Sequence, residues 1–117
     1  MLNDSIGRVK VPIRAAYGTD PELVKKILLK IANAHSMVVS KSPTIDAPWV
    51  LFKEFGDNAL MFELRCFITD IDYYWAVVSE INFSIAGAFK KAGIEIPFPQ
   101  TDLHLKSSEI AAFNQNK

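Results

Sequence analysis

The chain has 117 residues, 50% of them hydrophobic, which fits one domain with a single core. Its 13 basic residues balance 13 acidic ones, so no net field favours binding to a phosphate backbone or to anionic lipid. No apolar run reaches the roughly 20 residues that cross a bilayer as a helix, and no signal peptide pattern begins the chain. As written, the sequence predicts a soluble protein.

The single cysteine, Cys66, cannot form an internal disulfide. It lies inside an apolar alternating run, which predicts a small buried side chain and not a reactive thiol.

The first expected element is a strand from Arg8 to Ala16. Apolar and polar residues alternate there, which is the period of a strand with one buried face. Pro12 has no N–H for a central ladder, so this strand is expected at a sheet edge or at a bulge.

A helix is expected from about Asp20. The segment from Thr19 to Glu22 predicts a capping box, in which the Thr19 hydroxyl and the Glu22 carboxylate satisfy each other's backbone N–H groups. The predicted apolar stripe, spaced by three and four residues, comprises Leu23, Val24, Ile27, Leu28 and Ile31.

Residues 33–48 have no sustained period, which is typical of a loop, with a short strand expected at 37–39. Two further strands are expected at 49–55 and 59–68, joined by the Gly-Asp-Asn turn at 56–58. One face of the later strand is wholly apolar and comprises Leu60, Phe62, Leu64, Cys66 and Ile68. The other face mixes apolar and charged residues, which implies partial exposure or a partner.

The longest expected element is a second helix, capped by Thr69 or Asp70 and ended by Gly93, which suits the left-handed position after a helix. Its predicted apolar stripe comprises Ile71, Tyr74, Trp75, Val78, Ile81, Ile85, Ala88 and Phe89. Tyr74 and Trp75 are therefore expected in the core.

A stiff exit follows this helix. Pro97 and Pro99 fix their own φ angles and push the residues before them into extended backbone. A last strand is expected at 102–106, and a polar tail at 107–117.

The order strand, helix, strand, strand, helix, strand predicts an α+β fold of the ferredoxin-like βαββαβ type. Two helices would cover one face of a mostly antiparallel sheet, because right-handed crossovers leave few other topologies. The opposite sheet face stays uncovered unless something else packs against it.

The sequence argues against two activities that this fold hosts. The strand at 59–68 lacks the glycine and aromatic spacing of RNA-binding modules. Residues 15–18 lack the glycine-rich cradle that acylphosphatase-like enzymes need. Neither nucleic-acid binding nor catalysis is expected.

Acidic and histidine residues give no site either. Asp70 and Asp72 stand at a helix start, where carboxylates normally act as caps. His35 and His104 have no Cys, His or Asp partners at metal-ligand spacing. We therefore expect no metal and no cofactor.

The segment from Phe89 to His104 carries Ala92-Gly93-Ile94, the elbow Ile96-Pro97-Phe98-Pro99-Gln100 and Leu103-His104. Nearer the start, the Val9, Val11, Ile13 strand leads into Tyr17-Gly18-Thr19-Asp20 and a helix with Val24, Ile27 and Leu28. Over residues 6–106 the chain resembles the C-terminal cytoplasmic α/β domain of the MscS-type small-conductance mechanosensitive channel family.

That resemblance implies a domain of a homo-heptameric channel that opens under membrane tension and passes ions and small osmolytes. Residues 1–16 would end the middle β-domain and form the first strand, 17–106 would be the C-terminal α/β domain, and 107–117 a polar tail. The full-length protein would lie in the inner membrane through transmembrane helices absent from this sequence. The present segment would lie on the cytoplasmic side.

In that setting, residues expected at subunit contacts or in the vestibule wall are Tyr17, Asp20, Phe98, Pro99, Gln100 and His104. The alternative is a free-standing ferredoxin-like regulatory module that binds a small ligand or a protein partner through its exposed sheet. The upstream reading frame discriminates between them, because transmembrane helices there, the last rich in Gly and Ala, would support the channel.

Overall fold

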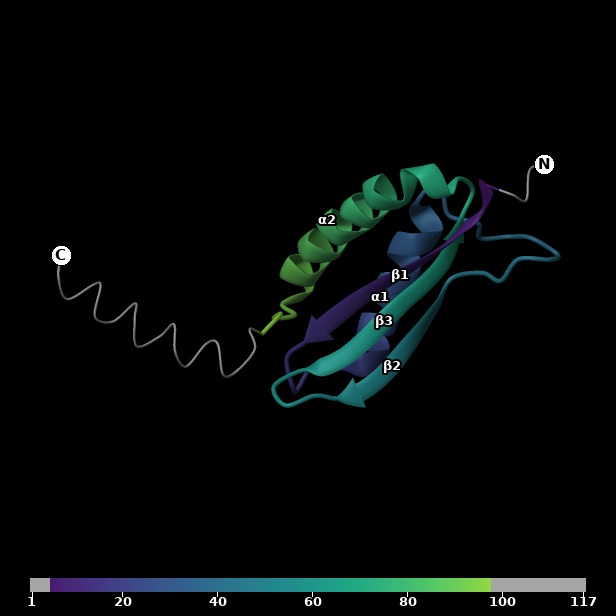
Figure 1. Cartoon of the computed structure of the whole chain (residues 1–117). Coiled ribbons are helices and arrows are strands. Elements are labelled where there is room, and N and C mark those ends of the chain that lie inside the picture. The colour runs from purple at the N-terminus through teal and green to yellow at the C-terminus, as the bar shows by residue number, and fades with distance from the viewer. Residues whose placement is uncertain (1–4, 98–117) are drawn as a thin grey trace, which may run out of the picture.

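The computed structural model describes residues 5–97, and Figure 1 shows a sheet with its helices packed against one side. The elements in chain order are β1 (Gly7–Ala15), α1 (Pro21–Ala34), β2 (Trp49–Phe55), β3 (Leu60–Ile68), the 3-10 turn η2 (Ile71–Tyr73) and α2 (Tyr74–Ala92). The strands and both helices predicted for this part of the chain are therefore present, with boundaries shifted by a few residues at most.

The sheet has the strand order β1-β3-β2, and both neighbouring pairs are antiparallel. β1 and β2 therefore run parallel to each other with β3 between them, which is the split βαβ arrangement. Pro12 lies in β1 opposite Glu63 of β3, and β1 is an edge strand of this sheet. Among residues 5–97 this agrees with the edge position that, with a bulge as the alternative, was predicted from Pro12, because its missing N–H is tolerated where no neighbouring strand needs it.

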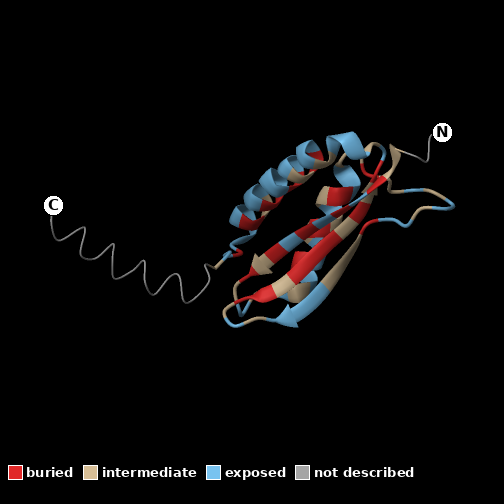
Figure 2. Cartoon of the chain, in the orientation of Figure 1, coloured by how far each residue is buried: buried red, intermediate tan, exposed pale blue. Residues whose placement is uncertain are grey.

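Alternating side chains of β1 and β3 form the floor of the core, as Figure 2 shows by the red bands along these strands. All five residues of the predicted apolar face of β3, from Leu60 to Ile68, are buried. α1 packs on β2 and β3, and α2 packs on β1, so both helices cover the same sheet face. Burying each large apolar side chain contributes roughly 1.5–3 kcal/mol, which makes this layer the main source of stability.

The start of α1 differs from the expected capping box. Asp20 is the N-cap, and its Oδ1 accepts a hydrogen bond from the Glu22 N–H at 2.9 Å. Pro21 occupies the first helical turn, where its fixed φ and missing N–H are favourable, so the helix cannot take Thr19 as its cap. The helix boundary was predicted correctly, but the capping box was wrong.

The phase of α2 also differs from the expectation. Its buried residues are Val77, Ile81, Ile85 and Phe89, whereas Trp75 is 76% exposed. Ile81, Ile85 and Phe89 of the predicted stripe are buried as expected, but residues two apart in a helix are about 200° apart, so burial of Val77 leaves Trp75 facing away from the core. Placing Trp75 in the core was therefore wrong, while Tyr74 packs half-buried against the core.

The ends of this second helical segment follow their local signals. Asp70 caps η2, and its Oδ1 accepts from the Asp72 N–H at 3.0 Å. Gly93 ends α2 with φ of 74°, and the Ile94 N–H donates to the Phe89 carbonyl at 2.9 Å. Asp70, one of the two caps predicted for the start, and Gly93, predicted for the end, are both confirmed. Gly93 suits its position because glycine adopts a positive φ without a Cβ penalty.

The short strand expected at 37–39 is an isolated bridge between Val38 and Ile68. The Val39 N–H donates to the Phe67 carbonyl at 2.8 Å, and the Thr69 N–H donates to the Met37 carbonyl at 3.0 Å. These three residues are too few to form a further strand of the sheet. Their hydrogen bonds attach the long loop to the end of β3.

The strand expected at 102–106 and the tail at 107–117 lie outside the described residues. The chain that leads to them is visible as far as Pro97. There the Ala16 N–H donates to the Glu95 carbonyl at 2.8 Å, which brings the exit from α2 beside the end of β1. Among residues 5–97, no helix is long and apolar enough to cross a membrane.

Candidate interaction surfaces

Two of the predicted contact residues lie in the described structure. Tyr17 is about half exposed, and its hydroxyl donates to the Gly56 carbonyl, which links the turn after β1 to the turn between β2 and β3. Asp20 is exposed and caps α1. Phe98, Pro99, Gln100 and His104 lie outside the described residues. Subunit contact by any of the six stays a prediction.

The sheet face opposite the helices carries side chains from all three strands, and we call it the outer sheet face. It comprises Arg8, Lys10, Pro12 and Arg14 of β1, Trp49, Leu51, Lys53 and Glu54 of β2, and Met61, Glu63, Arg65 and Phe67 of β3. No element of the described chain packs over it, as Figure 1 shows. The prediction of an uncovered second face is confirmed for residues 5–97.

Glu63 is the one buried charged side chain among the described residues, and it lies at the centre of the outer sheet face. Its Oε1 accepts a hydrogen bond from Arg65 Nε at 2.6 Å, and its Oε2 lies 3.7 Å from Lys53 Nζ. The hydrogen bond from Arg65 lowers the pKa of Glu63 below 4.5; burial opposes this, and the charges of Arg65, Lys53 and Lys10 reinforce it. The carboxylate thus stays ionised and joins β2 to β3.

An aromatic cluster forms one end of the outer sheet face. The rings of Trp49 and Phe67 have centroids 6.2 Å apart, and the Arg8 guanidinium lies 5.9 Å from the Phe67 centroid. These distances suit a tilted ring contact and a cation–π contact. The cluster therefore joins all three strands through side-chain contacts that lie outside the buried core.

A second apolar surface lies on α2, on the side away from α1, and we call it the α2 flank. Trp75 and Phe83 are 76% and 78% exposed there. With Val78, Ser79, Asn82 and Ala86 they line a hollow of about 440 Å³. Because the two rings line the same hollow, they form one exposed apolar surface, the kind of feature that can mark an interaction site. The sequence analysis did not reveal this surface, because it placed Trp75 in the core.

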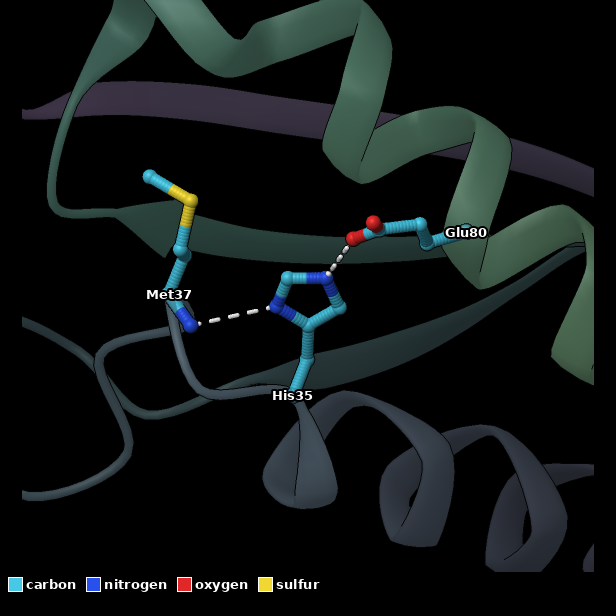
Figure 3. A network of polar contacts seen from close by, with 3 residues as sticks. All are labelled: His35, Met37 and Glu80. Atoms are coloured by element: carbon cyan, nitrogen blue, oxygen red, sulfur yellow. Dashed lines mark hydrogen bonds and ion pairs between the residues drawn. The ribbon is translucent and has the colours of Figure 1, made fainter.

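The two helices leave a groove of about 830 Å³ between them, lined by residues such as Ile27, Ile31 and Ala88. Figure 3 shows how His35, the C-cap of α1, bridges to α2 at this groove. Its Nε2 lies 2.6 Å from Glu80 Oε1, and its Nδ1 accepts from the Met37 N–H at 3.1 Å. Because Nδ1 is an acceptor, the neutral ring carries its proton on Nε2 and donates it to Glu80.

Neither His35 nor Cys66 has the surroundings of a chemical site. Within residues 5–97, no three His, Cys, Asp or Glu side chains are grouped closely enough to hold a metal ion. Cys66 is fully buried in β3, and desolvation raises the pKa of its thiol to about 11. The thiolate that a nucleophile requires is therefore scarce at neutral pH. Cys66 acts as the small buried side chain that its surroundings in the sequence predicted.

The sequence predicted one part of the charged cluster. Residues two apart in a strand share a face, which places Glu63 and Arg65 together on the mixed face of β3. Lys53 had no such signal, because its approach to Glu63 depends on the register shift between Phe52 and Glu54 in β2.

The architecture defines a small α+β domain that carries an exposed charged sheet face and exposed aromatic residues on α2. Comparison with known families agrees with that class. The family described as "Mechanosensitive ion channel MscS, C-terminal" matches residues 9–96. The chain therefore belongs to the MscS family of mechanosensitive ion channels, which are channels and not enzymes.

Individual relatives give the same result. The chain is 32% identical to mechanosensitive channel MscK of Escherichia coli, over 92% of this chain and 9% of MscK. It is 33% identical to small-conductance mechanosensitive channel MscMJ of Methanocaldococcus jannaschii, over 85% of this chain and 28% of that protein. The chain thus spans well under half the length of these relatives.

The fold matches a solved channel. Helicobacter pylori MscS in its closed state superposes with a TM-score of 0.70 at 26% identity, over 82% of this chain and 36% of that chain. The resemblance stated from the closing segment is confirmed, together with the fold class.

Proposed function

We propose that this chain forms part of the cytoplasmic vestibule wall of a mechanosensitive channel and mediates its self-association. In this proposal the full-length protein is a homo-heptamer in the inner membrane and releases ions and small osmolytes under membrane tension. Membership of the MscS family supports the channel setting. The observation that carries the self-association is the exposure of Trp75 and Phe83 on the α2 flank.

A ring of identical subunits needs two different surfaces on each subunit, one for each neighbour. The α2 flank lies over β1, at one side of the sheet. The opposite side is β2, where Phe55 is 73% exposed and its ring lies 5.0 Å from that of Phe52. Aromatic side chains on both sides of one domain fit a head-to-tail contact between neighbouring copies.

The test uses the full-length channel with Trp75→Ser and Phe83→Ser together, and separately with Phe55→Ser. Lys26→Ser, on the exposed face of α1, is the control because it changes a solvated helix position without removing aromatic area. We expect both aromatic variants to lower the fraction of intact oligomer by native mass spectrometry and to reduce survival of osmotic downshock. Wild-type assembly and survival in both aromatic variants would overturn the proposal.

A further inference from the structure

We propose that the outer sheet face concentrates small anions, and that in the channel it forms an anion-attracting part of the wall. The second half of this statement rests on the proposed function, while the first is a property of the chain alone. The residues that carry it are Lys10, Arg14 and Arg8 of β1, beside Arg65 of β3.

The charges of this balanced chain are unevenly placed. The outer sheet face holds five cations, Arg8, Lys10, Arg14, Lys53 and Arg65, against two carboxylates, Glu54 and Glu63. The chain as a whole has a net charge of zero, so the excess on this face is matched by acidic residues elsewhere. Although the whole chain is neutral, the outer sheet face therefore carries an excess of positive charge.

The register decides which cations stay unneutralised. Lys10 lies opposite Arg65, so two cations face each other across the β1–β3 pair. Glu63 is already engaged by Arg65 and Lys53. Within residues 5–97, no carboxylate lies at ion-pair distance from the side-chain nitrogens of Arg8, Lys10 or Arg14. Three cations of β1 therefore form a row along this strand with no carboxylate of the described chain at ion-pair distance, although the charge of Lys10 helps to lower the pKa of Glu63.

The shape of the outer sheet face favours loosely held, mobile anions over a single tightly bound anion. A tight anion site needs convergent donors in a pocket, but Lys10 and Arg8 line neither of the two hollows beside this face, and Arg14 lines one of them among mostly apolar residues. A row of separated cations on a sheet instead raises the local concentration of counter-ions over about one Debye length, which is about 8 Å at physiological ionic strength. Hydrated inorganic anions and small carboxylates are the solutes such a field favours.

Trp49 provides a probe on the same face. It lies opposite Arg65 in the register and contacts Phe67, and it is half-buried. The chain has two tryptophans, so Trp75→Phe leaves Trp49 as the single indole. Its quenching by iodide reports the local anion concentration, and quenching by neutral acrylamide reports accessibility alone. The ratio of the two Stern–Volmer constants is the measured quantity.

In that background, we expect Lys10→Gln with Arg14→Gln to lower the iodide-to-acrylamide ratio by about twofold, in line with modest surface focusing. The matched control is Lys25→Gln with Lys26→Gln, which removes two charges from exposed positions of α1 and should leave the ratio unchanged. Added salt should remove the difference between the variants. Circular dichroism melts show that each variant is folded. If the iodide-to-acrylamide ratio is the same for both pairs of variants, the proposal that this face concentrates anions is wrong.

A second measurement separates this inference from the proposed function. In the full-length channel under a potassium chloride gradient, Lys10→Gln with Arg14→Gln should shift the single-channel reversal potential toward that of potassium. An unchanged reversal potential together with a lowered quenching ratio would retain the anion-attracting face and overturn its place in the wall of the conduction path.

Discussion

His35 Nε2 lies 2.6 Å from Glu80 Oε1, so the residue that ends α1 is tied to the middle of α2. The same ring accepts the Met37 N–H through Nδ1, which fixes the start of the loop that follows. A single histidine thereby sets the spacing of the two helices at one end of their groove and directs the chain toward β3.

Removing the acceptor should loosen this link. We expect Glu80→Ala to lower the free energy of unfolding by about 1 kcal/mol, the typical net contribution of one hydrogen bond. Glu80→Gln keeps an acceptor oxygen and should lose less. Urea unfolding at neutral pH measures both changes, and equal losses for the two variants would show that the contact with His35 contributes nothing.

The Glu63 cluster predicts a pH dependence of stability. The pKa of Glu63 is lowered from 4.5, chiefly by the hydrogen bond from Arg65, so the folded state favours the carboxylate. That stabilisation is fully present above the unfolded value of 4.5 and is lost as the pH falls through the lower folded value.

Wild-type protein should therefore lose more unfolding free energy than Glu63→Gln when the pH is lowered from about 6 to about 3. Urea unfolding across that range compares the two proteins. Parallel pH profiles would contradict the ionised, hydrogen-bonded state of Glu63.

The N-cap of α1 can be tested against the capping box. Asp20→Ala should destabilise the protein by about 1 kcal/mol, because the Glu22 N–H loses its acceptor. Thr19→Ala should change the unfolding free energy by less than about 0.5 kcal/mol, as for an ordinary surface position. Thermal or urea unfolding measures both, and the reverse order would restore Thr19 as the cap.

The buried face of α2 gives a fourth comparison. Ile81→Ala removes a fully buried side chain and should cost about 3 kcal/mol, whereas Trp75→Ala removes an exposed one and should cost about 0.5 kcal/mol or less in the isolated chain. A larger loss for Trp75 in urea unfolding would mean that its ring is in the core. In the full-length channel, Trp75→Ala should weaken assembly more than it weakens folding.

Much of the fold was predictable because its signals are local. The alternation in 60–68 predicted the buried face of β3, and Pro12 predicted an edge strand. Gly93 predicted the end of α2, since its φ of 74° is a backbone position that favours glycine. Each of these depends on a residue and its near neighbours in the chain.

The errors came where two local signals competed. At α1, Pro21 took the first turn and left Asp20 as cap in place of Thr19. At α2, apolar residues lie on more than one side of the helix, and Val77 is buried in line with Ile81 while Trp75, about 200° away from Val77, is exposed. The α2 flank was not predicted, because Trp75 was placed in the core and Phe83 lay outside the predicted stripe.

By itself the sequence determined the element order, the strand that must lie at an edge, the caps at Asp70 and Gly93 and the apolar face of β3, since backbone sterics and side-chain period act over a few residues. Only the tertiary structure decided that the cations of β1 lie beside Arg65 and that Glu63 holds Lys53. Strand register pairs Lys10 with Arg65 about fifty positions away, and the register shift in β2 brings Lys53 to Glu63; no local period encodes either relationship.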